Sequence, residues 1–213
     1  MTKETMTIHK ALSELKIIDD RIGKAMGTTS FAKINRHNNA KIDGKTINEY
    51  KDIVNAAYAK TCDLINRRNA IKRAVVQSNA VATVKINGVA YTVAEAIDMK
   101  QTGMLHYQVL LEKLTTEWAH CRSEIEKRNG DKLVKDAETY VTGLLGSKEG
   151  KTNISDFEEA TKAYMSANAY DIVSPLNMTE LISELTDKID SFTSEVDSAL
   201  SVSNAITEIT IEY

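Results

Sequence analysis

Histidine and cysteine are the residue types of this sequence best suited to metal binding or nucleophilic chemistry, and they are scarce. The chain contains His9, His37, His106, His120, Cys62 and Cys121. Only His120 and Cys121 are adjacent, and neighbouring residues on a helix point about 100° apart, so these two cannot face one ion together. We expect no metal site, and we interpret both cysteines as reduced, small apolar side chains of helical cores.

Charged residues form clusters that could indicate acid–base chemistry or nucleic-acid binding. A nucleic-acid surface requires net positive charge and aromatic platforms, whereas this 213-residue chain has 27 basic and 30 acidic residues and a net charge of −3. We therefore interpret the clusters as solvent-facing helix charges with weak ion pairs, and we expect no nucleic-acid partner. The residues concerned are Asp19, Asp20, Glu124, Glu126, Glu158 and Glu159 among the acids and Arg67, Arg68, Lys72 and Arg73 among the bases.

The sequence contains no glycine-rich phosphate loop and no nucleophile motif. Trp118 shares a helical repeat with Met104 and Tyr107, and this spacing is typical of a core or an interface, not of a binding pocket. We therefore predict a non-enzymatic protein without catalytic residues, cofactor or small-molecule substrate.

The composition favours long helices, because the chain has one proline and nine glycines to interrupt them. Apolar residues recur at helical spacing along most of the sequence. The expected helices span about residues 5–26, 46–78, 92–128, 133–145, 154–170 and, capped by Asn177 or Thr179, the stretch to about 200.

Two capping boxes, Thr46-x-x-Glu49 and Thr92-x-x-Glu95, mark the starts of the two longest expected helices. Beyond each box, apolar residues repeat with alternating steps of three and four, as in coiled coils. We expect the two helices to form a long antiparallel hairpin whose stripes face protein partners. The stripes are Val54, Ala57, Thr61, Leu64, Arg68, Ile71 and Val75, and then Met104, Tyr107, Leu111, Leu114, Trp118, Cys121 and Ile125.

Short strands are predicted at three places. The Asn87-Gly88 pair within the alternating residues 83–91 indicates a tight hairpin, and the Asp43-Gly44 pair indicates a second turn. The C-terminal residues 206–213 are β-branched and alternate, so they form a strand that needs a partner. We expect that partner to be the 83–91 hairpin.

The sequence therefore predicts a mainly α fold, a long antiparallel helical hairpin or bundle with a small antiparallel β-ribbon. Residues 1–128 and 176–213 form the expected core. Residues 129–175 form a helical insertion that begins where Asn129-Gly130 breaks the helix and contains a polar loop over 146–153. No apolar run approaches the roughly 18 residues of a membrane span, and the N-terminus is polar, so we expect neither a span nor a secretory signal.

Two stretches carry a family resemblance. Residues 71–114 combine Asn79-Ala80, the Asn87-Gly88 turn and Thr92-x-x-Glu95-Ala96-Ile97, and the tail reads Asp197-x-x-Leu200-Ser201-x-x-Asn204-Ala205-x-Thr207-x-Ile209. This pattern, over about half of the chain, resembles the septicolysin-like helical family of unknown function. It is also similar to phage proteins, encoded among virion structural genes, that carry the label viral A-type inclusion protein. The resemblance implies structural motifs and no catalytic residues.

A helical bundle of this size exposes much surface per residue, so it gains by association with copies of itself. We therefore expect a structural or assembly protein, a virion-associated component such as a capsid or tail accessory protein of a phage or phage-like particle. It would be made in the host cytoplasm, or be cytoplasmic if no virion is involved, with itself or other virion structural proteins as partners. Two alternatives stay open: a membrane-active, cytolysin-like helical protein, which the family name implies, and an enzyme with residues that the sequence does not pair.

Overall fold

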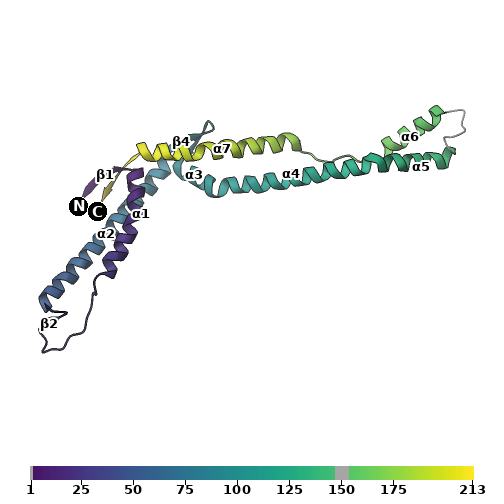
Figure 1. The fold of residues 1–213 in the computed structure, drawn as a ribbon. Helices are drawn as coiled ribbons and strands as arrows, with labels where there is room; N and C mark the ends of the chain where they lie inside the picture. Colours follow the sequence, from purple (N-terminus) through teal and green to yellow (C-terminus); the bar gives the residue numbers. More distant parts are fainter. Residues whose placement is uncertain (1, 147–153) are drawn as a thin grey trace. The chain divides into compact units, whose positions relative to one another are not determined.

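The computed structural model describes residues 2–146 and 154–213, and its elements are labelled in Figure 1. The chain divides into two compact units, Met1–Gly103 with Ser191–Tyr213, and Met104–Asp190. Most described residues are helical, and the described strands form two-stranded antiparallel sheets, which confirms the mainly α class with small antiparallel sheets. The expected insertion 129–175 lies within the second unit. Residues 147–153 of the expected polar loop lie outside the described residues.

The first unit is built on two long helices, α1 (Ile8–Gly27) and α2 (Ile47–Val81), which run side by side in opposite directions (Figure 1). The predicted capping box starts α2. The Thr46 hydroxyl accepts from the backbone N–H of Glu49, and the Glu49 carboxylate accepts from the Thr46 N–H at 2.8 Å. The second capping box, at Thr92, is also confirmed.

The long antiparallel hairpin of the fold therefore has α1 and α2 as its arms. The sequence predicts the 92–128 helix as the partner of α2, but the apolar stripe of α2 is occupied by α1. Its side chains Thr61, Ile71 and Val75 are buried within the chain. The heptad spacing identifies which residues share a face, and it does not identify the helix that covers them.

Both predicted turns form tight hairpins. Asp43 and Asn87 have φ angles of 48° and 49°, and the glycines that follow them have φ angles of 80° and 75°. Positive φ at both central positions is the geometry of a type I′ turn, in which glycine avoids the strain of a side chain. The turns join β2 (Lys41–Ile42) to β3 (Lys45–Thr46) and β4 (Thr83–Ile86) to β5 (Val89–Thr92).

The two ends of the chain pair with each other. Strand β1 (Lys3–Thr7) is antiparallel to β6 (Glu208–Glu212). This corrects two predictions: residues 5–7 belong to a strand and not to the first helix, and the C-terminal strand pairs with the N-terminus and not with the 83–91 hairpin. Met6 is the single large apolar residue of β1, so the local pattern is too weak to indicate a strand before its partner is known.

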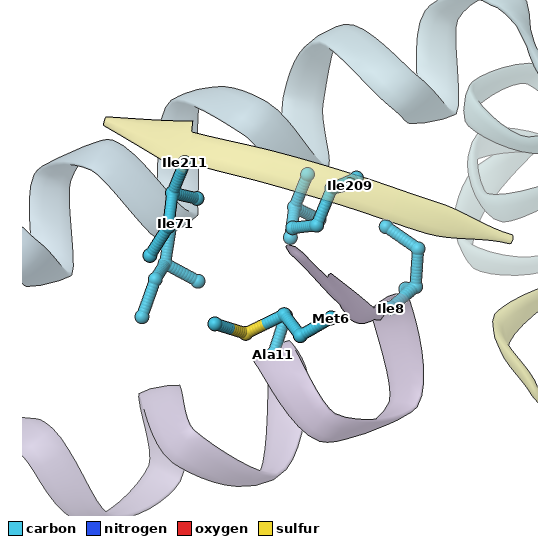
Figure 2. Close-up of a cluster of buried hydrophobic side chains, with 7 residues drawn as sticks. Met6, Ile8, Ala11, Ile71, Ile209 and Ile211 are labelled. Carbon is cyan, nitrogen blue, oxygen red and sulfur yellow. The ribbon is translucent and has the colours of Figure 1, made fainter. Parts of the chain in front are cut away.

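The β1–β6 sheet closes over the helical pair and forms the core of the first unit, shown in Figure 2. Alternate residues of β6 point inward, and α1 and α2 contribute one face each. Burial of these side chains stabilises the fold by on the order of 1–2 kcal/mol for each large residue. The buried cluster consists of Met6, Ile8, Ala11, Ile71, Val75, Ile209 and Ile211.

The hairpin β4–β5 leads into α3 (Val93–Asp98) and a π-helical turn, η1 (Met99–Gly103). Gly103 packs directly on Met99, because a Cβ placed on it would lie 2.4 Å from the Met99 sulfur. The hairpin tip is tied to the last part of helix α7 (Met178–Ile206). There, the Asn87 N–H donates to the Glu195 carboxylate at 2.6 Å.

The second unit contains α4 (Met104–Lys127), a π-helical turn η2 (Arg128–Lys132), α5 (Leu133–Leu145), α6 (Ile154–Asn168) and the first part of α7. The break expected at Asn129-Gly130 is this π turn. Gly130 leaves helical geometry there, with φ −77° and ψ −141°.

Side-chain contacts hold the second unit together. The Asn129 side chain donates to the Tyr170 carbonyl at 2.7 Å and accepts from the Tyr170 N–H at 2.8 Å. The rings of Tyr140 and Tyr164 lie 4.8 Å apart between α5 and α6. Of the two caps expected for the last helix, Asn177 is the one used, since its side-chain oxygen accepts from the Glu180 N–H at 3.4 Å.

Arg67 on α2 joins four segments of the first unit. Its guanidinium donates to both oxygens of Glu14 on α1, to Glu4 on β1 at 2.8 Å and to the Tyr213 hydroxyl at the C-terminus. It also lies over the Tyr213 ring, 5.0 Å from its centre. The hydrogen bonds to Glu14 are the largest cause that raises the pKa of Arg67 further above its usual range. The guanidinium in turn lowers the pKa of Glu4, with a smaller contribution from Lys10.

We predict that Arg67→Ala lowers the free energy of unfolding by about 2–3 kcal/mol, because it leaves Glu14 and Glu4 without their common partner. The Arg67 side chain is only 18% exposed. Its neighbour Arg68 is 38% exposed and pairs with the more exposed Asp19, so Arg68→Ala is the matched control and should cost at most about 0.5 kcal/mol. Urea unfolding followed by circular dichroism measures both. Equal losses would contradict the assigned role of Arg67.

We also predict a stability loss in acid that depends on the helix caps. Backbone hydrogen bonds from Thr46 and Thr92 lower the pKa of Glu49 and Glu95 below the ordinary value of 4.5. A lowered folded pKa contributes stability that is complete above the unfolded pKa and is lost as pH falls through the folded pKa. The double variant Glu49→Gln/Glu95→Gln keeps the acceptor oxygens without titrating them.

Its melting temperature should therefore fall less between about pH 5 and pH 3 than that of the unmodified protein. Glu126→Gln, which changes an exposed carboxylate outside the caps, is the control. A decline in the double variant that equals the decline in the unmodified protein would exclude the caps as its source.

Candidate assembly surface

The structure separates the histidines and cysteines that could do chemistry. The described residues contain no group of three or more His, Cys, Asp or Glu side chains that could hold a metal ion. His120 and Cys121 both lie on the exposed surface of α4. The core role expected for Cys121 is therefore wrong, whereas Cys62 is half-buried on α2.

The basic run on α2 is not one solvated face. Arg67 is enclosed by the partners described above, which corrects the expectation of a weak surface ion pair. Arg68 donates to Asp19 at 3.1 Å, and Lys72 and Arg73 are exposed. The charges of this run therefore point in different directions, and one of them is used inside the fold.

Most carboxylates that are neighbours in the sequence are exposed, and Glu124 forms ion pairs. Asp20, Glu126, Glu158 and Glu159 are exposed. Glu124 pairs with Lys127 at 3.2 Å and with Arg128 at 3.5 Å. The hydrogen bond from Lys127 is the main cause that lowers the pKa of Glu124.

The stripe on α4 is only partly covered. Met104 is the one buried residue of this helix, and the other stripe residues are half-buried or exposed. The first part of α7 contacts this helix at Tyr107, where the Lys188 ammonium lies 3.9 Å from the centre of the ring. The flank beyond it remains open, and Leu110 there is 44% exposed. We call Leu110, Leu114, Trp118 and Cys121 the α4 ridge.

A second apolar row lies on α2, beside the stripe that packs on α1. Tyr58 is 64% exposed, Ile65 36% and Val76 56%. Steps of seven and eleven residues place these side chains on one side of a helix. This row and Leu110 were not predicted from the sequence, because a seven-residue repeat identifies one apolar stripe on each helix. The same spacing rule, applied to the residues outside that stripe, would identify the row.

The solvent-accessible surface area of the chain is larger than that of a compact protein of the same mass. The structure exposes 14,975 Å², whereas a compact protein of its mass exposes about 9,800 Å². Two separate compact bodies with the lengths of the two units would expose only about 12,000 Å² together. The surplus therefore exists whatever the placement of the two units. Uncovered helix faces contribute to it together with the exposed irregular segments 28–40 and 169–177.

Two cavities in the described part of the chain lack the combination of side chains that a reaction centre needs. One of about 470 Å³ lies between β4 and the end of α7, lined mainly by apolar side chains and backbone. Another of about 460 Å³ is lined by Arg128, Tyr164, Tyr170, the ion-paired Glu124 and Lys127 of α4, and residues of α5. Neither brings together a nucleophile, a base and an orienting group.

No protein-family model, curated protein or solved structure matches the chain. Within the part of the chain that the structure describes, no helix is both long enough and apolar enough to cross a lipid bilayer. The main exposed features of the structure are open apolar rows on amphipathic helices, which are typical of faces that associate with protein.

We predict that Cys121 reacts with Ellman's reagent faster than Cys62 in dilute protein, because the Cys121 thiol is exposed and the Cys62 thiol is half-buried. The native protein should release thionitrobenzoate in a fast and a slow phase of equal amplitude. Cys121→Ser should remove the fast phase, and Cys62→Ser the slow one. A single rate for both thiols would contradict the exposure of the α4 ridge.

Proposed function

We propose that the protein is a non-enzymatic structural or assembly protein whose copies associate through exposed apolar helix rows, above all the α4 ridge. The surplus of accessible surface supports this proposal most directly. It amounts to on the order of 3,000 Å², and a stable protein interface needs about 1,200–2,000 Å² in total. Covering such faces in an assembly would supply the apolar burial that the chain does not supply by itself.

The residues of the α4 ridge are suited to an interface. A tryptophan flanked by leucines provides a large apolar area with few rotatable bonds, which is the composition of interface anchors. The ridge is bordered by Lys113 and Glu117, which pair with each other at 3.1 Å. The occupant that we propose for this apolar ridge is another apolar helical face.

The particle is proposed from the sequence resemblance. The motifs of residues 71–114 and the C-terminal tail resemble those of phage proteins encoded among virion structural genes, and this resemblance alone suggests the particle. We propose that the assembly is a phage or phage-like particle in which the protein is a capsid or tail accessory component, with other virion structural proteins as further partners.

Self-association is tested with the full chain by sedimentation velocity and by the emission of its single tryptophan. We predict oligomers at micromolar concentration and a blue shift of Trp118 emission as they form, because the half-buried ring becomes covered. Leu110→Glu places a charge on the ridge and should raise the dissociation constant about tenfold or more. Gln108→Glu adds the same charge on the opposite side of α4, where Gln108 is exposed, and should leave association unchanged.

A protein that stays monomeric at every concentration and binds no virion protein would contradict the proposal. Release of dye from liposomes by the monomer would instead support the membrane-active alternative.

A further inference from the structure

The hydrogen bonds between β1 and β6 determine which backbone N–H and C=O groups of β1 have no partner in a neighbouring strand. The backbone N–H groups of Thr2 and Tyr213 each donate to the carbonyl of the other residue. The Ile8 N–H donates to the Thr207 carbonyl at 2.9 Å. With the observed register, the even-numbered residues of β1 therefore bond to β6. The N–H and C=O groups of Lys3 and Thr5, and the N–H of Thr7, face the opposite side.

That opposite side is an open sheet edge. The sheet contains only β1 and β6, so no strand of the described chain pairs with the outer edge of β1. Lys3 and Thr5 are exposed. An edge of this kind is a template for another strand unless charge, proline or a covering helix blocks it.

The other edge of the sheet is less suited to pairing with itself. The outward residues of β6 are Glu208, Thr210 and Glu212, and an antiparallel pair of two β6 strands centred on Thr210 places Glu208 opposite Glu212. Like charges directly opposite are destabilising. Strand β6 also packs against α2, as Figure 2 shows, whereas β1 continues into α1.

We infer that the β1 edge pairs with the β1 edge of a second copy, antiparallel about Thr5, and forms a continuous four-stranded sheet with order β6, β1, β1, β6. Centring on Thr5 pairs the whole strand, with Lys3 opposite Thr7 and Glu4 opposite Met6. A shift of two residues toward either end shortens the pairing, and centring on Lys3 or Glu4 places like charges opposite each other. The two-fold pairing closes, so it yields a dimer and not a fibre.

This inference rests on the proposed self-association and specifies how two copies meet. A five-residue strand pair is too small to form a stable interface by itself. Strand pairing selects the register and the symmetry of the dimer, and other contacts between the two copies supply the buried area.

Proline substitutions on the two edges provide the test. Thr5→Pro removes an outward N–H of β1, and Thr210→Pro removes an outward N–H of β6, so neither breaks a bond between the two strands. Both variants lose the same Thr5–Thr210 hydroxyl hydrogen bond of 3.0 Å. Thr5→Pro should raise the dissociation constant of the dimer at least about tenfold, since each dimer loses two symmetric bonds. Thr210→Pro should leave it unchanged.

Hydrogen exchange of the unmodified protein provides a readout that needs no variant. The amides of Thr5 and Thr7 should become protected as the concentration rises through the dissociation constant, and the amide of Thr210 should not. Oligomers with a rapidly exchanging Thr5 amide, or oligomers that only Thr210→Pro disrupts, would overturn the β1 pairing and leave the proposed assembly function intact. A chain that is monomeric throughout would overturn both.

Discussion

The charge of Arg67 is the interaction on which the first unit depends. A guanidinium held at the junction of a sheet and two helices loses hydration, so its carboxylate partners must be in place for the unit to close. Those partners come from β1 and α1, and the aromatic partner is the last residue of the chain. The network therefore selects one arrangement of the ends of the chain, and the apolar cluster beneath the sheet supplies the stabilisation.

Outside that junction, the helices carry apolar residues that no other part of the described chain covers. Helix α2 uses one face against α1 and leaves a second apolar row exposed. Helix α4 buries one residue fully. Apolar rows left exposed on amphipathic helices are the observation behind the proposed association of copies.

Local signals in the sequence predicted local structure correctly. The boxes at Thr46 and Thr92 and the turns at Asp43 and Asn87 lie where the sequence predicted them, because each depends on residues within a few positions. The β1–β6 pair was not predicted, since it joins residues about as far apart as the chain allows.

The candidate surface was predicted in part. The repeat placed Trp118 and Cys121 on one face, but spacing does not reveal whether another element covers that face. For the same reason the repeat did not reveal that Arg67 turns inward while Arg68, one position along, pairs at the surface.

The pairing of β1 with β6 has a consequence for biosynthesis. Strand β1 leaves the ribosome long before its partner, since the paired residues Thr5 and Thr210 are 205 positions apart. The core shared by α1, α2 and this sheet therefore cannot be completed until residues 208–212 have been synthesised. Truncation before β6 would leave β1 and the apolar faces beneath it uncovered, so chains without β6 would be open to proteolysis while chains with it are protected.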